Sequence, residues 1–448
     1  MYKKVIASSL ILLFALAICF TFSCTRQEND TDAEKKAAIR RTIIAYITSD
    51  NNLNQNLNTD INEMKLGSKK LPSDCRMVLF VDQLYNTPYI AELENGEMKT
   101  IKQYNEDFYS TSADSMKNVL QWIIDQYPTN EYALIFTGHG TGSIAAEDTV
   151  QTNFTKLYAY GYDAHGEDSK TSTNKWLNIP SLAMVLNNLN NQHEEKIKFE
   201  YIFFDCCCMQ TVETAYELKE STHYIIAPAS ETLASGAPYE AVVPILGTDK
   251  DEVGKAIIDE YINSTSWGNT GGIAISCVKT SEMDNLLDAT IAALNSVKER
   301  KIANYEWSED GIWDGVQWVK DKLELDKTRC IYYYKGEETG NAPVLHDIKN
   351  IMLLNLSSSE YYKWLTQFEK TVIASYCPSG NAKEPWLSAV GINFYSFDVT
   401  EDKCGAMGMI VPNAAYDDLH GFFSTISLNQ TMFDLVWSNK VGWHSMGW

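Results

Sequence analysis

The sequence predicts an α/β fold in which a mainly parallel sheet carries helices on both faces. Short apolar runs such as Thr42–Thr48 and Tyr201–Phe204 have the composition of strands that are buried on both faces. Between such runs lie segments with helical spacing, for example Met116–Ile124, whose apolar residues recur three and four apart. Because the two patterns alternate from residue 42 to about residue 297, crossover connections and parallel strands are expected.

The other elements of this region follow from the same two patterns. Strands are expected at Met77–Asp82, Tyr132–Thr137, His223–Pro228 and Gly271–Cys277, and helices at Leu53–Leu66, Pro180–Leu189, Val212–Leu218, Glu252–Ile262 and Ser281–Val297. The polar, glycine-dotted stretch Ile144–Asn178 is expected to be a long loop, which in a compact domain is usually functional or mobile. After Val297 the chain has charged helical segments, aromatic residues and two strand-like runs, Val390–Phe397 and Gly405–Val411.

These patterns divide the 448-residue chain into four segments. They are a signal peptide at 1–23, a lipidated Cys24 with a flexible tether at 24–40, an α/β domain at 41–297, and a C-terminal α/β subdomain at 298–448. The formal net charge of −22 argues against binding a nucleic-acid backbone or an anionic membrane surface through charge. It is compatible with basic peptides as partners.

The first 24 residues have the pattern of a secretory signal. Lys3 and Lys4 precede the apolar run Val5–Phe22, which is followed by Ser23 and Cys24. A cysteine at this point resembles the lipidated cysteine of bacterial lipoproteins, although the usual leucine three places before it is missing. A plain signal peptide and an uncleaved anchor helix are the alternatives. We expect a lipid anchor in the bacterial cell envelope, on the periplasmic or cell-surface side, or otherwise a secreted chain that touches the membrane only through this anchor.

The sequence lacks the spacings of a disulfide framework and of the common zinc sites. Of the ten cysteines, Cys19 belongs to the signal and Cys24 to the lipid. The other eight are scattered, apart from the triple Cys206–Cys208, and no repeated spacing suggests a disulfide framework. There is no pair of CxxC motifs for structural zinc and no HExxH motif, so a metal-dependent hydrolase is disfavoured.

Two segments place reactive side chains directly after predicted strands. One continues into Gly-His-Gly at 138–140, and the other into Asp-Cys-Cys-Cys-Met at 205–209. Ligands gather outside the carboxyl ends of strands in open α/β sheets, so a histidine and a cysteine far apart in sequence can meet there as base and nucleophile. Taken alone, a hydrogen-bonded turn histidine and buried core cysteines are open alternatives, and spacing does not show which cysteine faces the histidine.

The two segments resemble those of the cysteine peptidase clan that includes caspases, legumain, gingipains and clostripain. More narrowly, they are similar to the clostripain family, whose cysteine segment reads Asp-Ala-Cys-Leu-Met before a helix containing Glu-x-Ala-Tyr-Glu-Leu. Here residues 213–218 read Glu-Thr-Ala-Tyr-Glu-Leu. Further matching stretches are Tyr46–Leu53, Ile179–Leu182, Gly236–Tyr239 and Gly408–Asn413. The resemblance spans about residues 42 to 443 and implies a caspase-like fold.

The resemblance also implies roles for individual residues. His139 and Cys207 would form a catalytic dyad, with backbone N–H groups near Gly140 and Cys207 stabilising the oxyanion. Asp205 matches the acid that binds the arginine or lysine before the cleaved bond, and a helix-capping role is its alternative. Glu231 and Asp50 are weaker candidates to line the cleft.

The neighbours of the dyad depart from the family pattern. Cys206 and Cys208 take packing positions beside the nucleophile, and each is a disulfide partner that could silence it. Gly138 replaces a bulkier residue of relatives, which predicts a looser His139.

Processing and metal binding are further implications of the resemblance. Some relatives mature by cutting themselves between the histidine and cysteine segments, where this chain has Lys156, Lys170 and Lys175. No cofactor is required, but calcium is possible because some relatives need it. The acidic residues of the loop match no fixed calcium pattern, so a solvated acidic loop is favoured and no metal ligand is assigned. These acidic residues are Glu147, Asp148, Asp163, Glu167 and Asp168.

The function expected from these observations is that of a monomeric, secreted cysteine endopeptidase acting on polypeptides after arginine or lysine. The alternative is a catalytically silent surface lipoprotein that binds peptides or glycans through its aromatic C-terminal part. The intact His-Gly and Asp-x-Cys segments favour the enzyme.

Overall fold

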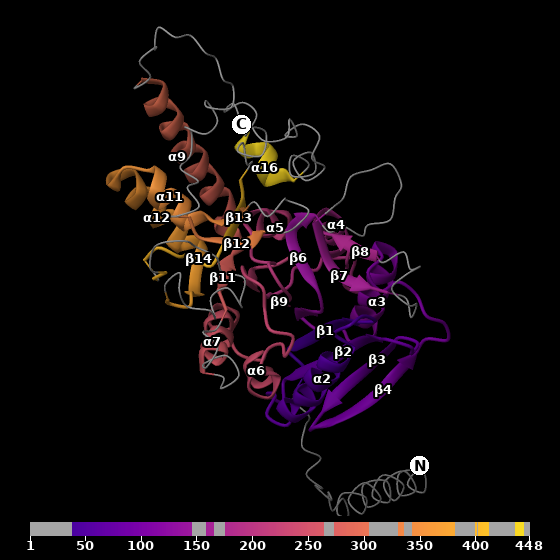
Figure 1. The fold of residues 1–448 in the computed structure, drawn as a ribbon. Coiled ribbons are helices and arrows are strands. Elements are labelled where there is room, and N and C mark those ends of the chain that lie inside the picture. The colour runs from indigo at the N-terminus through magenta and orange to yellow at the C-terminus, as the bar shows by residue number, and fades with distance from the viewer. Residues whose placement is uncertain are drawn as a thin grey trace, which may run out of the picture. The chain divides into compact units, whose positions relative to one another are not determined.

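A nine-stranded mixed sheet is the central element of residues 39–448 in the computed structural model (Figure 1). The strand order is β14-β11-β10-β9-β5-β1-β2-β3-β4. The five strands β10, β9, β5, β1 and β2 are parallel, and the strands outside them pair antiparallel. The strands are β1 (Arg41–Ser49), β2 (Cys75–Gln83), β3 (Tyr89–Glu94), β4 (Glu97–Gln103), β5 (Glu131–Thr137), β9 (Ile202–Asp205), β10 (Tyr224–Pro228), β11 (Ile275–Lys279) and β14 (Val372–Tyr376).

The structure describes residues 38–145, 158–164, 175–263, 273–303, 330–335, 343–380, 399–400, 402–411 and 435–442. The predicted signal peptide, Cys24 and most of the tether lie outside these residues, as does the strand-like run Val390–Phe397. Residues 39–448 form one unit and residues 1–38 another. The division at residue 297 stays a prediction, although β14, from beyond it, pairs with β11 in the central sheet.

Helices cover both faces of the sheet because side chains of successive strand residues point to opposite faces. On β1, Ile44 and Tyr46 pack in a core with helices such as α3 and α5, whereas Ile43 and Ile47 pack in a second core with α2, α6 and α7. The helices are α2 (Asn54–Ser68), α3 (Ala113–Gln126), α4 (Ile179–Asn187), α5 (Val212–Leu218), α6 (Tyr239–Ile245), α7 (Lys250–Asn263), α9 (Met283–Ala303), α11 (Ile348–Asn355), α12 (Ser358–Thr371) and α16 (Val436–Val441). The predicted fold class is confirmed.

In the region predicted as a long loop, Ile144–Asn178, the described residues form the strands β7 and β8 and the end of β6 instead. β6 (Gly140–Ala145), β7 (Tyr158–Asp163) and β8 (Lys175–Asn178) form an antiparallel sheet in that order. The prediction was wrong because one side chain anchors this polar stretch: Tyr160 is fully buried, and its ring lies 4.6 Å from that of Phe136. Its hydroxyl donates to the carbonyl oxygens of Tyr46 and Thr137 at 3.1 and 3.2 Å.

The C-terminal part contributes a small sheet next to the cysteine segment. It contains β12 (Tyr332–Lys335), β13 (Pro343–Asp347) and β15 (Gly408–Ile410). The N–H of Gly408 donates to the carbonyl of Gln210 at 2.9 Å, so this sheet braces the chain just after the cysteine triple. Cys377 and Cys404 form a disulfide, for which the cysteine spacing gave no signal.

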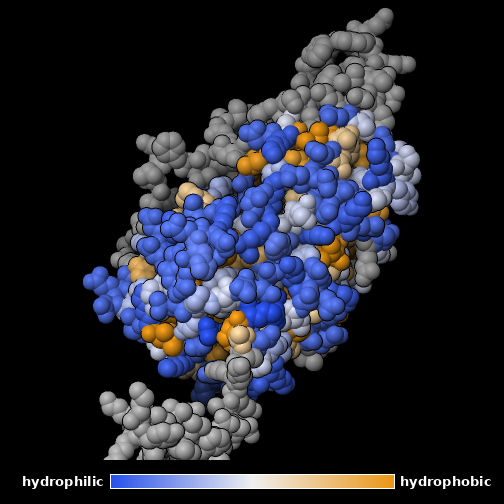
Figure 2. Space-filling view, turned by 180° about the vertical axis from the view of Figure 1, so that it is seen from behind, coloured by the Kyte–Doolittle hydropathy of each residue, from blue (hydrophilic) through white to orange (hydrophobic). Residues whose placement is uncertain are grey.

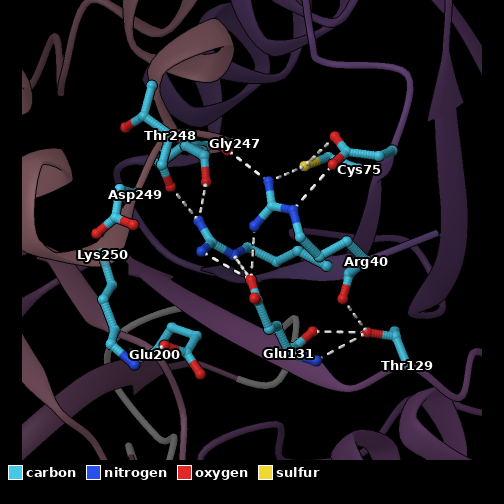
Figure 3. A network of polar contacts seen from close by, with 12 residues as sticks. Arg40, Cys75, Thr129, Glu131, Glu200, Gly247, Thr248, Asp249 and Lys250 are labelled. Atoms are coloured by element: carbon cyan, nitrogen blue, oxygen red, sulfur yellow. Dashed lines mark hydrogen bonds and ion pairs between the residues drawn. The ribbon is translucent and has the colours of Figure 1, made fainter.

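An ionic network closes the amino-terminal edge of the sheet (Figure 3). Glu131, at the start of β5, accepts from the guanidinium groups of both Arg40 and Arg41 at 2.7 and 2.9 Å. Arg41 is 2% exposed and also donates to the carbonyls of Leu246 and Thr248. The chain after α6 is thereby tied to β1 and β5 at the edge opposite the histidine and cysteine segments.

The face drawn in Figure 2 is largely hydrophilic where its residues are coloured, in keeping with the net charge of −22. Figure 2 shows one face on which hydrophobic residues form only small, separate groups. Within the part of the chain that the structure describes, no helix combines the length and the apolar character needed to cross a membrane.

Candidate active site

The histidine and cysteine segments leave the sheet side by side. β5 and β9 are neighbouring parallel strands, and Thr137 pairs with Asp205 in their register. His139 and Cys207 each follow two residues after that pair, at the carboxyl edge where ligands of α/β sheets gather. The two segments therefore lie next to each other at this edge of the sheet, as the sequence predicted.

Two glycines permit this approach. An ideal Cβ on Gly140 would lie 2.7 Å from the carbonyl oxygen of Cys207, closer than real Cβ contacts, so only glycine lets the backbone after His139 touch the cysteine segment. Gly138 has φ +133°, and a Cβ there would lie 2.4 Å from Oγ1 of Thr48. Gly138 therefore fits a turn that any side chain would obstruct. The sequence led us to expect only that a glycine here would hold His139 more loosely.

His139 is half-buried and held on several sides. Its Nε2 lies 2.7 Å from Oδ1 of Asn52, and an amide oxygen at this position favours the tautomer that carries its proton on Nε2. The rings of Tyr162 and Trp176 lie 5.9 and 6.2 Å from the imidazole. Burial lowers the pKa of His139 below its ordinary value. Sequence reasoning missed Asn52; its only signal was the Asp-Asn-Asn cluster after β1.

Cys207 is half-buried, and its sulfur faces Thr232. The N–H of Thr232 donates to Sγ at 3.3 Å, and the Thr232 hydroxyl lies 3.6 Å from it. Burial raises the pKa of the Cys207 thiol, although the hydrogen bonds from Thr232 act in the opposite direction. The resting side chain is therefore a neutral thiol at pH 7.

The flanking cysteines have packing positions. Cys206 is 0% exposed, and its Sγ donates to the carbonyl of Phe136 at 3.3 Å. Cys208 is 2% exposed and has φ +57°, which turns the chain out of the strand direction. Neither forms a disulfide in the structure.

Asp205 lies at the end of β9 with a second carboxylate close by. Its Oδ1 accepts from the hydroxyl of Tyr261 at 2.7 Å and its Oδ2 from the N–H of Ala237 at 2.9 Å. A Cβ on Gly236 would lie 2.9 Å from Oδ2 of Asp205 and 2.8 Å from Oδ2 of Asp60, so this glycine separates the two acids. Burial, and then the charge of Asp205, raise the pKa of Asp60 to about 9.

The pairing of Asp60 with Asp205 was also missed by sequence reasoning. Asp60 lies inside α2, where its helical position alone suggests only a surface acid. It is nevertheless 2% exposed, and its Oδ1 has no hydrogen-bond partner.

The remaining candidate residues do not gather at one place in the structure. Glu231 is exposed, and its charge contributes to the raised pKa of Cys207, so it lies near the sulfur. Asp50 is 1% exposed and belongs to a separate group of carboxylates with Asp82 and Asp107. Lys175 begins β8, and its side chain is not among those described. Outside the described residues lie Lys156, Lys170, Glu147, Asp148, Glu167 and Asp168.

The mixed, mainly parallel α/β sheet carries the His-Gly and Asp-x-Cys segments at the carboxyl ends of adjacent strands, which is the arrangement that the resemblance to cysteine peptidases implies. The model of the clostripain family matches residues 45–385. The chain belongs to the clostripain family of cysteine peptidases.

Relatives agree with this assignment. The chain is 22% identical over 235 residues to clostripain of Hathewaya histolytica, a match that covers 47% of this chain and only 41% of that protein. Its fold is similar to a secreted C11 cysteine protease from Bacteroides thetaiotaomicron in complex with an irreversible peptide inhibitor, with TM-score 0.65 and 21% identity over 91% of this chain and 99% of that one. It is also similar to an inactive zymogen C11 protease from Parabacteroides distasonis, with TM-score 0.62 and 19% identity over 90% and 97% of the two chains.

Proposed function

We propose that this chain is a cysteine endopeptidase that cleaves polypeptides after arginine or lysine. The observation that carries the proposal is a pair of buried carboxylates. One is Asp205, two residues before Cys207 at the end of β9, and the other is Asp60 of α2, which approaches it on the far side of Gly236. Two acids in one enclosed place strongly favour a cation, and a guanidinium or ammonium group would let both ionise.

His139 and Cys207 could together carry out the proton transfers that cleavage of a peptide bond needs. The Cys207 thiol would lose its proton to Nδ1 of His139 as the sulfur attacks the peptide carbonyl, with N–H groups near Gly140 and Cys207 stabilising the oxyanion. The resulting imidazolium would give that proton to the leaving amine, which departs as the C–N bond breaks. His139 would then take a proton from water as the hydroxide adds to the thioester carbonyl. The C–S bond breaks, the peptide acid leaves, and the imidazolium returns its proton to the sulfur, which restores the thiol and the neutral histidine.

Substrate entry requires a movement near Asp205. This side chain is 6% exposed, and the N–H of Ala237 occupies its Oδ2. A basic side chain would therefore displace the segment at Gly236 and Ala237, or bind first to Oδ1 of Asp60, which has no hydrogen-bond partner. Glu231 would lie at the exposed side of the same pocket.

The proposed setting is the bacterial cell envelope, with the chain secreted and held by lipid on Cys24 as a monomer. The disulfide between Cys377 and Cys404 supports an oxidising compartment, because disulfides persist there and are rare in the cytosol. Neither a metal ion nor an organic cofactor takes part in the proposed chemical steps.

The test is labelling with an arginyl acyloxymethyl ketone, followed by mass spectrometry of the adduct. We expect an adduct on Cys207 in the wild-type chain and none in Cys207→Ala, together with cleavage of a peptide library after arginine or lysine by the wild type alone. A folded wild-type chain that neither reacts nor cleaves would support the alternative, a silent lipoprotein that binds peptides or glycans.

A further inference from the structure

Two aromatic rings beside His139 have no part in the chemical steps described above. One belongs to Tyr162 of β7 and the other to Trp176 of β8. Their centroids lie 5.9 and 6.2 Å from that of the imidazole and 5.5 Å from each other. All three side chains are only half-buried, so apolar ring surface stays open to solvent next to His139.

The fold holds both rings in place. On β8, Leu177 is 3% exposed and packs in the core, so its neighbour Trp176 points to the opposite face of the strand. On β7, the carbonyl of Tyr162 accepts a hydrogen bond from Nδ2 of Asn51 at 2.6 Å, which ties this strand to the chain after β1. A surface fixed in this way binds a ligand at a small cost in conformational entropy.

Strand order places His139 between these rings and Cys207. β6 touches the cysteine segment, since an ideal Cβ on Gly140 would lie 2.7 Å from the carbonyl oxygen of Cys207. β7 pairs with β6 and β8 with β7, so the strands that carry the rings step away from that segment (Figure 1). In the central sheet, the order β9-β5-β1 likewise places Cys207, His139 and Asn52 after successive strands. The rings therefore lie on the side of His139 that faces away from Cys207.

We propose that Tyr162 and Trp176 bind an apolar or aromatic side chain of the substrate residue that follows the cleaved bond. During cleavage the substrate carbonyl carbon lies at the sulfur of Cys207, and the leaving nitrogen receives a proton from His139. The residue that carries this nitrogen must continue past His139, where the two rings lie. Aromatic side chains typically line sites for apolar groups. This inference rests on the proposed function.

The test uses matched peptides that differ only in the residue after a single arginine. Leucine and asparagine have similar shapes but differ in polarity, and phenylalanine adds a ring. For the wild type we expect kcat/KM to be at least about tenfold higher with leucine or phenylalanine than with asparagine, because burying an apolar side chain is favourable and burying an unpaired amide is not. Equal values would overturn this inference alone. A folded wild-type chain that cleaves none of the peptides would refute the proposed function, and this inference with it.

Substitutions distinguish a substrate subsite from a support for His139. Trp176→Ala should bring kcat/KM for the leucine and asparagine peptides to within about twofold of each other, whereas Trp176→Phe keeps an aromatic face and should retain most of the preference. An equal loss on both peptides in Trp176→Ala, with their ratio intact, would show that the ring only supports the imidazole. The matched control is Trp122→Ala, which removes a half-buried tryptophan of α3 that lies beneath the ammonium group of Lys102. It should change neither the rates nor their ratio.

If Trp176→Ala does not fold, the wild-type chain alone provides a second measurement. With an arginine ester as the acyl donor, leucinamide or asparaginamide competes with water for the acyl group on Cys207. The amine forms a C–N bond to the thioester carbonyl, the C–S bond breaks, and the amine proton passes through His139 to the sulfur. At equal concentration, leucinamide should give at least about fivefold more amide product than asparaginamide, because only its side chain gains from contact with the rings. Equal yields would overturn the proposal.

Discussion

At the scale of single residues, the surroundings of His139 and of Cys207 each favour the neutral side chain. Burial lowers the pKa of the imidazole and raises that of the thiol, and both shifts oppose an imidazolium–thiolate ion pair. The thiolate would then form only as its proton moves to His139 during attack. A neutral thiol would protect Cys207 from oxidation, because reactivity follows the thiolate fraction.

The raised pKa of the Cys207 thiol predicts the pH dependence of its alkylation. With a thiol pKa above its ordinary value, the thiolate fraction rises about tenfold per pH unit through the neutral range and levels off only at alkaline pH. The rate of modification of Cys207 by iodoacetamide, followed by mass spectrometry, should therefore still increase between pH 7 and pH 9. Cys207→Ala corrects for the other cysteines. A plateau beginning between pH 5 and 7 would instead reveal an ion pair.

Replacing Asp60 by asparagine should stabilise the fold at high pH and weaken the proposed binding of basic residues. Its folded pKa of about 9 lies well above its ordinary value, so its favourable contribution is complete below about pH 4 and is lost as the pH rises through 9. Asp60→Asn keeps the shape and removes this titration. Its melting temperature should therefore rise relative to the wild type as the pH goes from 5 to 9.

The same substitution should weaken the selection of basic residues. Loss of one carboxylate from the pair should lower kcat/KM for an arginyl substrate by about tenfold or more, because a charge-assisted interaction is removed. Parallel pH and kinetic measurements on wild type and Asp60→Asn test the two effects separately. If melting differences stay constant across the pH range, Asp60 does not titrate as described.

At the scale of elements, the amino-terminal edge of the sheet depends on Arg41. Removing this 2% exposed side chain would leave the carbonyls of Leu246 and Thr248, and partly Glu131, without their donor. Because Glu131 retains Arg40 and is 28% exposed, we expect Arg41→Met to lower the free energy of unfolding by about 2–4 kcal/mol.

A neighbouring strand supplies the control. Arg76 on β2 pairs with Glu92 at 3.0 Å, with both side chains about a quarter exposed. Arg76→Met should cost about 1 kcal/mol or less, since partly exposed ion pairs contribute little. Urea denaturation followed by circular dichroism gives both values. Equal midpoints for the two variants would show that the buried arginine does not stabilise this edge.

Sequence patterns identified those elements whose burial extends along the whole segment. The apolar runs became the parallel strands β1, β2, β5, β9 and β10, and the stripe at Met116–Ile124 became α3. The hairpin of β3 and β4 was missed because β4 is mostly exposed, although Asn95 and Gly96, both with positive φ, form a turn that the Asn-Gly pair signals. β6 to β8 were missed because their burial depends on single side chains such as Tyr160.

At the site, sequence reasoning found the residues that follow strands and missed those that reach it from elsewhere. His139, Cys207 and Asp205 could be placed from strand ends and from the family resemblance. Asn52 and Asp60 could not, because a loop amide and a helical aspartate acquire their partners only through tertiary packing. The carboxylate group of Asp50, Asp82 and Asp107 likewise assembles from three segments whose spacing has no motif.

At the scale of the whole molecule, strand order decides what internal cleavage can do. The histidine strand β5 and the cysteine strand β9 are neighbours in the sheet, yet the chain between them passes through β6, β7 and β8. A cut in that stretch would place β1 to β5 on one fragment and β9 to β14 on the other. The two fragments would still share a continuous sheet and both cores, so cleavage would release local constraint without separating His139 from Cys207.

The last prediction therefore concerns self-processing at Lys156, Lys170 or Lys175. Purified wild-type chain should be cut there, as mass spectrometry of its fragments would show, while Cys207→Ala stays whole. The fragments should elute together in size-exclusion chromatography and separate only in denaturant, because the β5–β9 pairing spans the cut. Replacing all three lysines by alanine should abolish cutting and reduce the initial rate on an arginyl substrate. A triple variant that stays whole and hydrolyses at the full rate would show that cleavage does not open the site, and fragments that part without denaturant would contradict the shared sheet.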